Sequence, residues 1–249
     1  GETVYLGADY DLAMACYLLA RVLKTGGGSE RALPLLIEAQ KRFEDAERDK
    51  PGCGAERMGL ICHGGQGDCF FFLGRLDEAA TAYEESIRRA EKRGDDREVA
   101  VGNGNLGSVR LEQRHYKEAL KAYEDAREKF MQLDEPGTVA KIWHQIGIVY
   151  QGAGQPDAAE DAYRKSLAIK VRLGDVAGQA ATLGQLGILY DNDLGRTEEA
   201  VAFINQAADK FVESRDQAKE GMVRSNLAIC LIKLHRLDDA RQEIRRAIE

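Results

Sequence analysis

Proline and long apolar runs are scarce in this sequence. Four prolines among 249 residues leave room for long helices, because proline breaks a helix interior. The longest apolar stretches fall far short of the roughly 20 residues that a membrane-spanning helix needs. Residues 1–25 lack a basic start followed by a clean apolar run. The sequence therefore predicts neither a membrane partner nor a secretory signal.

Cysteine is present, but not in a paired pattern. The five cysteines are scattered along the chain at Cys16, Cys53, Cys62, Cys69 and Cys230. An odd, dispersed set argues against a disulfide framework. A reducing cytosol is the simplest setting for such a chain, so we predict a cytoplasmic location.

Positive charge is not in excess. The 35 Lys and Arg residues are outnumbered by 42 Asp and Glu residues, which gives a net charge of −7. Nucleic acids are bound by clustered Lys and Arg, so we expect no nucleic-acid partner. The balance either steers basic or neutral partners modestly toward the chain or simply keeps it in solution.

Motifs of catalysis and metal binding are also missing. The sequence holds no Gly-x-Ser-x-Gly turn, and Gly64-Gly65-Gln66-Gly67 falls within an expected helix rather than after a strand. Zinc is considered for Cys53, Cys62, His63 and Cys69, but their spacing lacks the close ligand pairs of structural sites. We therefore predict no enzyme activity, no metal and no cofactor. Cys69 is expected to be a core cysteine instead.

A repeated phrase is the main positive signal. It recurs at intervals of 40, 40 and 41 residues, as Asn105-Leu106-Gly107, Gln145-Ile146-Gly147, Gln185-Leu186-Gly187 and Asn226-Leu227-Ala228. Self-similarity at this period indicates a stacked array of small units rather than one globular core.

Six units align on an alanine that follows this phrase. The anchors are Ala32, Ala79, Ala119, Ala159, Ala200 and Ala240. Each anchor is followed at +4 by a bulky residue and at +7 by a small one, so the three lie on one face of a helix that we call helix B. Helix A precedes it and carries the repeated phrase. Glycine inside helix A predicts a close helix contact that leaves no room for a Cβ atom.

Turn residues punctuate the repeats. Five residues before the anchor, where a left-handed turn is expected, stand Gly27, Gly74, Arg114, Gly154, Gly195 and His235. Arg114 and His235 predict turns that are strained or differently shaped. Between units, the residues expected to cap the next helix A are Asp95, Asp134, Asp175 and Asp216. One extra residue is expected in the turn near residues 191–193, and a longer loop at residues 50–54.

Seven residues of the fourth unit carry a resemblance to a known family. They are Trp143, Ile146, Gly147, Tyr150, Ala159, Tyr163 and Ser166, and they match the tetratricopeptide repeat signature. The repeat of about 40 residues, with Gly-Asp between units, resembles that of kinesin light chain, of the Pins/LGN adaptors and of the tetratricopeptide arms of bacterial regulators. Gln66 departs from the pattern, which leaves the packing of the second unit open.

The resemblance implies a fold. We expect an all-α, right-handed superhelical solenoid of about six helix-turn-helix repeats, with the helices A lining the concave side. Residues 1–249 are predicted to form a single array, with repeats at about 8–50, 55–94, 96–134, 136–174, 176–215 and 217–249.

Four amides directly precede the Leu-Gly position, at Asn105, Gln145, Gln185 and Asn226. One residue is a 100° step around a helix, so these side chains are expected beside the core, as an amide ladder along the groove. An amide offers donors and an acceptor, which suits a peptide backbone, and the Pins-like relatives use Asn here in this way. The alternative is four ordinary polar residues. Neighbours on the same face are Ser108, Lys141, His144 and Ser225. His144 either binds a carboxylate of the ligand or covers Trp143.

These patterns predict a non-catalytic scaffold that binds a peptide segment of a partner protein in its concave groove. The alternative is a sensory or autoinhibitory arm that acts on an effector domain of the same polypeptide. Apolar residues cover most of the helix at residues 10–24, and neither end shows a solvating cap. The ends are expected to meet a second copy or missing flanking domains, unless the array is self-sufficient.

Overall fold

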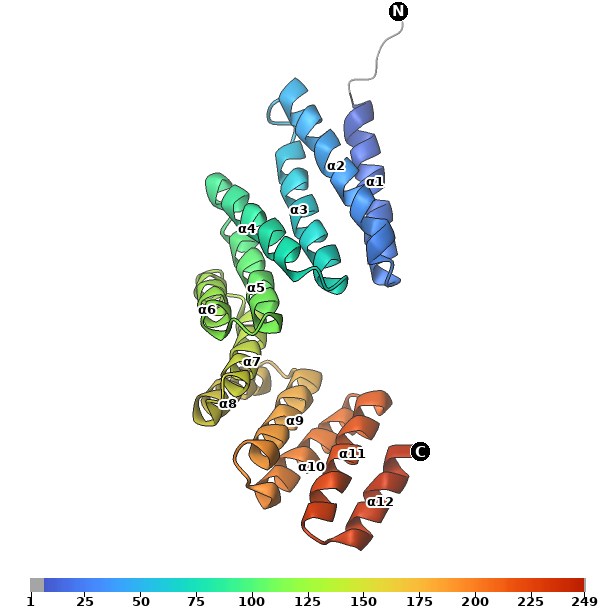
Figure 1. The fold of residues 1–249 in the computed structure, drawn as a ribbon, viewed down its shortest axis with the longest axis vertical. Coiled ribbons are helices and arrows are strands. Elements are labelled where there is room, and N and C mark those ends of the chain that lie inside the picture. The colour runs from blue at the N-terminus through green and yellow to red at the C-terminus, as the bar shows by residue number, and fades with distance from the viewer. Residues whose placement is uncertain (1–6, 249) are drawn as a thin grey trace, which may run out of the picture. The chain divides into compact units, whose positions relative to one another are not determined.

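The structure, a computed structural model, describes residues 7–248, and these form helices and turns only. The helices of this described part are α1 (Ala8–Thr25), α2 (Ser29–Asp49), α3 (Ala55–Phe72), α4 (Leu76–Arg93), α5 (Asp96–Glu112), α6 (Tyr116–Gln132), α7 (Pro136–Gly152), α8 (Pro156–Arg172), α9 (Val176–Asn192), α10 (Thr197–Glu213), α11 (Gln217–Lys233) and α12 (Leu237–Ile248) (Figure 1). The predicted all-α fold of helix-turn-helix repeats is confirmed. Each predicted repeat range holds one helix pair, although the ends of the predicted array, residues 1–6 and 249, lie outside the described residues.

Two compact units make up the chain, residues 1–129 (unit 1) and residues 130–249 (unit 2). In unit 1, helices α1 to α5 pack each against the next along the chain. In unit 2, α7 to α12 do the same. Packing between sequence neighbours is the pattern of a solenoid, in which each helix buries its apolar face on the helices before and after it. That both units form a single array stays a prediction.

The anchor alanines form the centre of the packing. All six of the aligned alanines are buried, as helix B was expected to place them. The bulky residue four positions later is buried in the first five repeats, for example Tyr163 in α8 and Ile204 in α10. Its counterpart in α12, Ile244, is 42% exposed, because no later helix of the described residues covers it.

Glycines of helix A face these bulky side chains at very short range. A Cβ atom added to Gly147 would lie 2.5 Å from the ring of Tyr163, and one added to Gly187 would lie 2.3 Å from Ile204. Gly67 and Gly107 meet Tyr83 and Tyr123 in the same way. The predicted close helix contact is therefore confirmed, and it is made between helices A and B of one repeat.

Turns between helices A and B share one backbone conformation. Arg114 and His235 adopt φ of 59°, close to the φ of 70° at Gly154. The strained alternative is therefore correct, because a side chain in the left-handed region costs conformational energy that glycine does not. The turn after α9 has four residues, 193–196, where the other repeats have three. The predicted extra residue and the longer loop at residues 50–54 are both confirmed.

Aspartates cap three of the four helices A that were expected to carry them. The carboxylates of Asp95, Asp175 and Asp216 accept hydrogen bonds from the backbone N–H three residues on, at 3.2, 2.9 and 3.2 Å. The prediction for Asp134 was wrong. It has φ of 54° and occupies the left-handed position of Gly94, so Glu135 is the N-cap residue of α7. The junction was misaligned by one residue.

Gln66, the departure from the repeat pattern, is accommodated by hydrogen bonds. Its side chain is buried, and its amide donates to Gln40 Oε1 at 2.7 Å and to the Leu36 carbonyl at 3.4 Å. Cys69 is fully buried in the core of unit 1, as predicted. No group of three His, Cys, Asp or Glu residues within residues 7–248 is placed to hold a metal ion.

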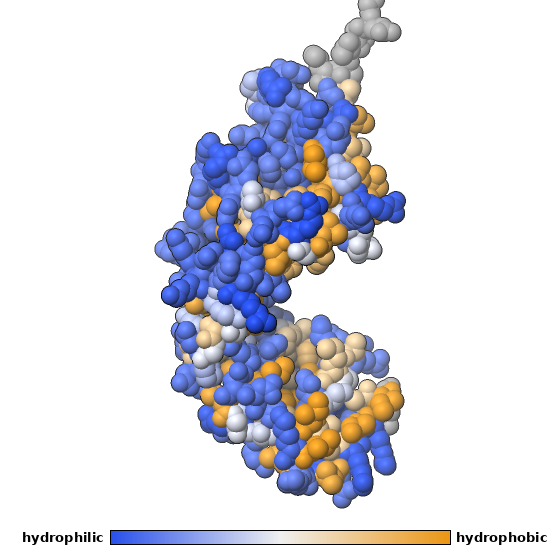
Figure 2. Space-filling view, viewed as in Figure 1, coloured by the Kyte–Doolittle hydropathy of each residue, from blue (hydrophilic) through white to orange (hydrophobic). Residues whose placement is uncertain are grey.

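Apolar side chains are exposed on α1 and α12 (Figure 2). On α1 they are Leu12, Leu18, Leu19 and Val22, and on α12 they are Leu237, Ile244 and Ile248. That a second copy or a flanking domain covers these faces stays a prediction. Among residues 7–248, no helix is both long enough and apolar enough to cross a membrane.

Candidate functional site

Three rungs of the amide ladder lie together in unit 2. Gln145 is on α7, Gln185 on α9 and Asn226 on α11, at equivalent positions, whereas Asn105 lies on α5 in unit 1. Each of these side chains is half-buried. None of the four amides has a hydrogen-bond partner within the described part of the chain, so all of them are available to a ligand.

Side-chain bonds tie neighbouring helices A of unit 2 to one another. Gln151 of α7 donates to Asp193, just after α9, at 2.7 Å. Lys233 of α11 donates to Asp191 of α9 at 2.6 Å. These links hold the C-terminal ends of the three helices beside one another. Gln185 and Asn226 line the same hollow, and that all the amides form a row stays a prediction.

A row of isoleucines runs along one side of the amides. Ile148, Ile188 and Ile229 each lie three residues after an amide, and Lys141, Ala181 and Met222 each lie four residues before one. Residues at i, i+4 and i+7 share one helical face. We call these nine residues of α7, α9 and α11 the A-face of unit 2, and Ile148, Ile188 and Ile229 its isoleucine row.

Two adjoining hollows open on this face between α9 and α11. One, of about 210 Å³, includes Gln185, Met222 and Val223 in its lining, and the other, of about 230 Å³, includes Ile229 and Cys230. They share Ile188, Ile204 and Asn226, so together they form one furrow in which an amide stands between apolar side chains.

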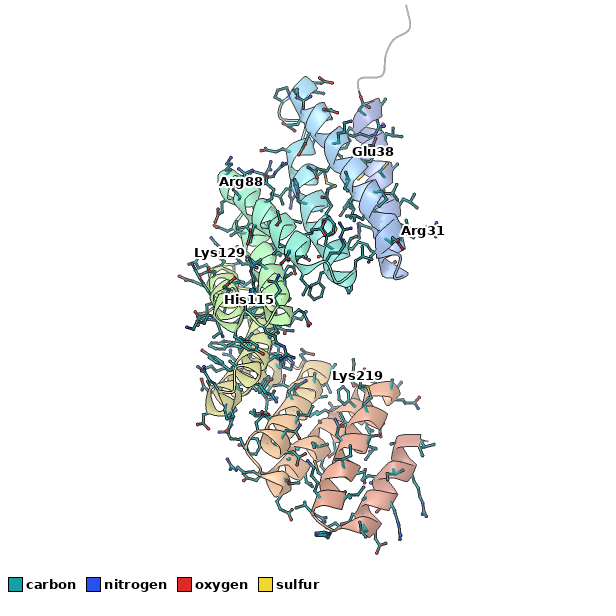
Figure 3. All side chains as sticks on the ribbon, viewed as in Figure 1. Arg31, Glu38, Arg88, His115, Lys129 and Lys219 are labelled. Carbon is teal, nitrogen blue, oxygen red and sulfur yellow. The ribbon has the colours of Figure 1, made fainter. Side chains whose placement is uncertain are left out.

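Charged groups at the furrow are already paired. Lys219 lies in the first turn of α11 (Figure 3) and forms an ion pair with Asp216 at 2.8 Å. Lys233 is paired with Asp191. Met222 and Ile229, in contrast, are 69% and 53% exposed. The furrow therefore favours apolar side chains and neutral polar groups over charged ones.

His144 lines the furrow as a neutral ring. Burial, helped by the positive charge of Lys170, lowers the pKa of His144 to about 4. The ring lies 5.5 Å from that of Tyr163, and its Nδ1 is 3.2 Å from Thr182 Oγ1. Trp143, which His144 was considered to cover, has the Lys165 ammonium 4.6 Å from its ring centroid.

The hydrogen bonds of Thr182 assign the proton of this ring. The Lys170 ammonium donates to Thr182 Oγ1 at 2.7 Å, and the hydroxyl donates its single proton to the Gly178 carbonyl at 3.0 Å. With the hydroxyl proton on the shorter contact, to Gly178, Nδ1 of His144 is assigned as the N–H donor to Thr182, which leaves Nε2 as an acceptor. Such a ring suits a ligand N–H group better than the carboxylate considered from the sequence.

Lys170 is a charged group in an apolar setting. Its side chain is 5% exposed, and burial lowers the pKa of its ammonium to about 8. Asp175 opposes this shift and Lys141 adds to it. Lys170 donates to Thr182 and acts on His144 and Lys141 through its charge, so its role is in positioning and stability.

The remaining predicted residues are less available. Ser108 Oγ lies 2.9 Å from the Tyr123 hydroxyl and 3.2 Å from the Gly104 carbonyl, in unit 1. Ser225 donates to the Gly221 carbonyl of its own helix at 2.9 Å. Lys141 is exposed on the A-face. Unit 2 thus holds six of the eight predicted residues, namely Lys141, His144, Gln145, Gln185, Ser225 and Asn226.

Sequence reasoning missed two exposed apolar residues of the furrow, Met222 and Ile229. The same period that identified the amides identifies them, because each occupies the A-face position of its helix at −4 or +3 from Asn226.

Part of this chain is similar in sequence to known proteins. A protein from Emericella nidulans described as "Clustered mitochondria protein homolog" is 28% identical over 107 residues, which is 42% of this chain and 9% of that protein. The chain thus spans less than a tenth of the length of this relative.

Solved structures share the fold. BtubC (BKLC) from P. vanneervenii is 23% identical, with a TM-score of 0.71, over 86% of this chain and 84% of that one. A signal transduction ATPase with a tetratricopeptide repeat sensor, from Pyrococcus horikoshii, is 18% identical with a TM-score of 0.79, over 95% of this chain and 36% of that one.

Models of protein families match most of the chain. One model described as "Tetratricopeptide repeat" matches residues 61–132 and 138–211, and a second of the same description matches residues 17–95. Together they cover most of the chain, and they agree with the glycine contacts and the helix pairs described above. The chain belongs to the tetratricopeptide repeat family.

Proposed function

We propose that this chain is a non-catalytic interaction module that holds an extended peptide segment of a partner protein on the A-face of unit 2. The observation that carries this proposal is that Gln145, Gln185 and Asn226 occupy equivalent positions of α7, α9 and α11 without a hydrogen-bond partner in the described residues, each three residues before a member of the isoleucine row. Ile229 is 53% exposed, whereas Ile148 is half-buried and also packs against the core of unit 2.

An extended peptide matches the two rows. Its backbone exposes N–H and C=O groups, and each amide can both donate to and accept from them. Successive side chains of an extended chain point to opposite sides, so alternate side chains would reach the isoleucine row while the others face solvent. The Nε2 acceptor of His144 supplies a further partner for a backbone N–H group. The site would therefore recognise the peptide backbone and apolar side chains rather than a particular charge.

Single substitutions test this assignment. Peptides recovered by display on the wild-type chain would be titrated, by fluorescence polarisation, against Gln145→Ala and Gln185→Ala. Each variant should weaken binding about two- to twelvefold, because one net hydrogen bond contributes about 0.5–1.5 kcal/mol. Stability should stay within about ±0.5 kcal/mol, as for surface changes.

Leu186→Ala is the matched contrast in the same helix. Leu186 is fully buried, so this change should cost about 2–5 kcal/mol of stability. Unchanged binding by both amide variants would reject the amide ladder as a binding site.

A second candidate is a sensory or autoinhibitory arm acting on an effector domain in the same polypeptide. It is supported by the fold shared with the sensor of the Pyrococcus horikoshii signal transduction ATPase. Binding of the displayed peptides by this chain alone would be compared with binding by a longer polypeptide that contains it. Loss of peptide binding in the longer polypeptide would favour the arm.

A further inference from the structure

Unit 1 has a hollow of its own, at a place where the amide ladder is interrupted. The hollow has a volume of about 280 Å³ and is lined mainly by residues of α1, α3 and α5, with Leu36 of α2 and Tyr83 and Ser86 of α4. In the second repeat, Gly64 and Gly65 stand where the fourth repeat has His144 and Gln145. Both glycines line the hollow. A Cβ atom at Gly64 would lie 3.9 Å from Ser86, whereas one at Gly65 would lie 3.2 Å from Leu36, whose side chain fills part of the space.

One acidic group of this hollow is already satisfied. Asp68 on α3 forms an ion pair with Lys24 of α1, and the Tyr83 hydroxyl donates to its other oxygen at 2.6 Å. The charges of Lys24 and Asp68 cancel, so neither is left to attract a ligand.

Glu98, on α5, is not satisfied. Its side chain lines the hollow and is half-buried, and its carboxylate has no ion-pair or hydrogen-bond partner within residues 7–248. Asn105 lies two turns further along the same helical face, with Val101 between them, and its amide is also without a partner there. The α5 wall of the hollow therefore presents a carboxylate, an apolar patch and an amide in a line.

We infer that this hollow receives a basic side chain of a bound peptide. The cation would pair with the Glu98 carboxylate and donate to Asn105 Oδ1, while its aliphatic stem would lie against Val101 and Leu60. Arginine suits the site better than lysine, because its planar guanidinium can pair with a carboxylate through two hydrogen bonds. This inference rests on the proposed peptide-binding function but uses other residues, in the other unit.

An acidic side chain is the main rival occupant, because Arg21 lies at the same hollow. Arg21 is exposed, however, and its guanidinium carbon lies 5.7 Å from the ring centroid of Tyr17. Ion pairs of exposed side chains contribute little, whereas a half-buried carboxylate is less screened by water. Arg21 and Glu98 both lack an ion-pair partner within residues 7–248, and of the two charges we expect that of the half-buried Glu98 to dominate inside the hollow.

The experiment is an NMR titration of amide shifts in the ¹⁵N-labelled chain. The probes are N-acetyl-arginine methylamide, its uncharged citrulline analogue and N-acetyl-glutamate methylamide. We expect saturable shifts for residues 98–105 with the arginine probe only. Glu98→Gln should weaken that binding by about five- to tenfold, which is the effect of losing a charge-assisted hydrogen bond.

Matched variants test whether a loss of binding reflects the lost side chain rather than unfolding of α5. Glu112→Gln removes one exposed carboxylate from the same helix outside the hollow and should leave the arginine affinity unchanged. Asn105→Ala keeps the carboxylate and should weaken binding about two- to tenfold. Unchanged shifts elsewhere in the spectra of the variants would show that α5 remains folded.

Several results would overturn the inference. Among the probes, these are saturable binding of the glutamate probe at residues 98–105, equal binding of the arginine and citrulline probes, or no saturable shift with any probe. Among the variants, it is an unchanged affinity of Glu98→Gln for the arginine probe. Failure of the A-face in unit 2 is a separate result, because Gln145→Ala and Gln185→Ala leave this titration untouched.

Discussion

The contact between Gly147 and Tyr163 gives the sharpest prediction about stability. Glycine in a helix interior normally costs up to about 1 kcal/mol relative to alanine, so Gly→Ala should stabilise an unobstructed helix. Gly184 in α9 is such a site, since a Cβ added there would be 4.0 Å from its nearest neighbour, Val223. At Gly147 the same atom would lie 2.5 Å from the Tyr163 ring, which is fully buried.

The two alanine variants should therefore differ in sign. Gly184→Ala should raise the free energy of unfolding by about 0.5–1 kcal/mol. Gly147→Ala gains the same propensity but adds an overpacking cost of about 1–3 kcal/mol, because the ring cannot move into free space. A net loss of up to about 2 kcal/mol is expected, and Gly147→Leu should lose more.

Urea unfolding followed by circular dichroism would measure these changes, and hydrogen exchange of α7 amides would localise them, since repeat proteins open unit by unit. A double-mutant cycle of Gly147→Ala and Tyr163→Leu should give a coupling energy of at least about 1 kcal/mol, because the smaller side chain leaves room for the added methyl group. A gain in Gly147→Ala equal to that in Gly184→Ala would refute the close-contact explanation.

Further expectations concern a strained turn and two titrating groups. Arg114→Gly should raise the free energy of unfolding by about 0.5–1 kcal/mol, because glycine adopts the left-handed backbone conformation without strain. A thermal melt with an unchanged midpoint would contradict this. Burial lowers the pKa of Lys170 to about 8 from its usual 10.5, so protonated Lys170 destabilises the fold at pH 7. Lys170→Met should therefore be more stable than the wild type by about 1–3 kcal/mol at pH 7, and this difference should shrink as the pH increases from about 8 to 10.5, as urea melts of both chains at each pH would show. His144, with a pKa of about 4, should stay neutral, so its NMR signals should not titrate between pH 5.5 and 8.

Much of the repeat architecture was predictable because it rests on local, periodic packing. The anchor alanines and the helix A glycines recur at fixed spacing, and each contact they make is within one repeat or with the next. The misassigned cap at Asp134 shows where this reasoning fails. Asp is acceptable both as an N-cap and in the left-handed position, so its identity could not decide between two alignments one residue apart.

The candidate site was predictable only in part. The amides could be placed on one face from their position beside the buried Leu-Gly pair. The charge state of His144 could not, because it depends on burial of the ring and on the charge of Lys170, which lies on another helix. The hollow in unit 1 also escaped prediction. The repeat alignment places Gly65 at the position of Gln145, but the structure is needed to show that Gly65 and Glu98 line one hollow.

The two units thus present different chemistry from one repeat pattern. In unit 2, paired charges leave an apolar furrow with free amides. In unit 1, the interrupted ladder leaves a hollow with an unpaired carboxylate, Glu98. A partner that used both units would need an apolar segment and a basic residue, which is a stricter requirement than either unit imposes.

Backbone recognition by the amides is the central claim, and replacing single backbone amides of a bound peptide by esters tests it most directly. A displayed peptide would be scanned in this way against the wild-type chain and against Gln185→Ala by fluorescence polarisation. We predict that at least one ester position weakens wild-type binding by about two- to twelvefold and has no further effect in Gln185→Ala. Equal losses in both chains at every position would show that Gln185 does not contact the peptide backbone.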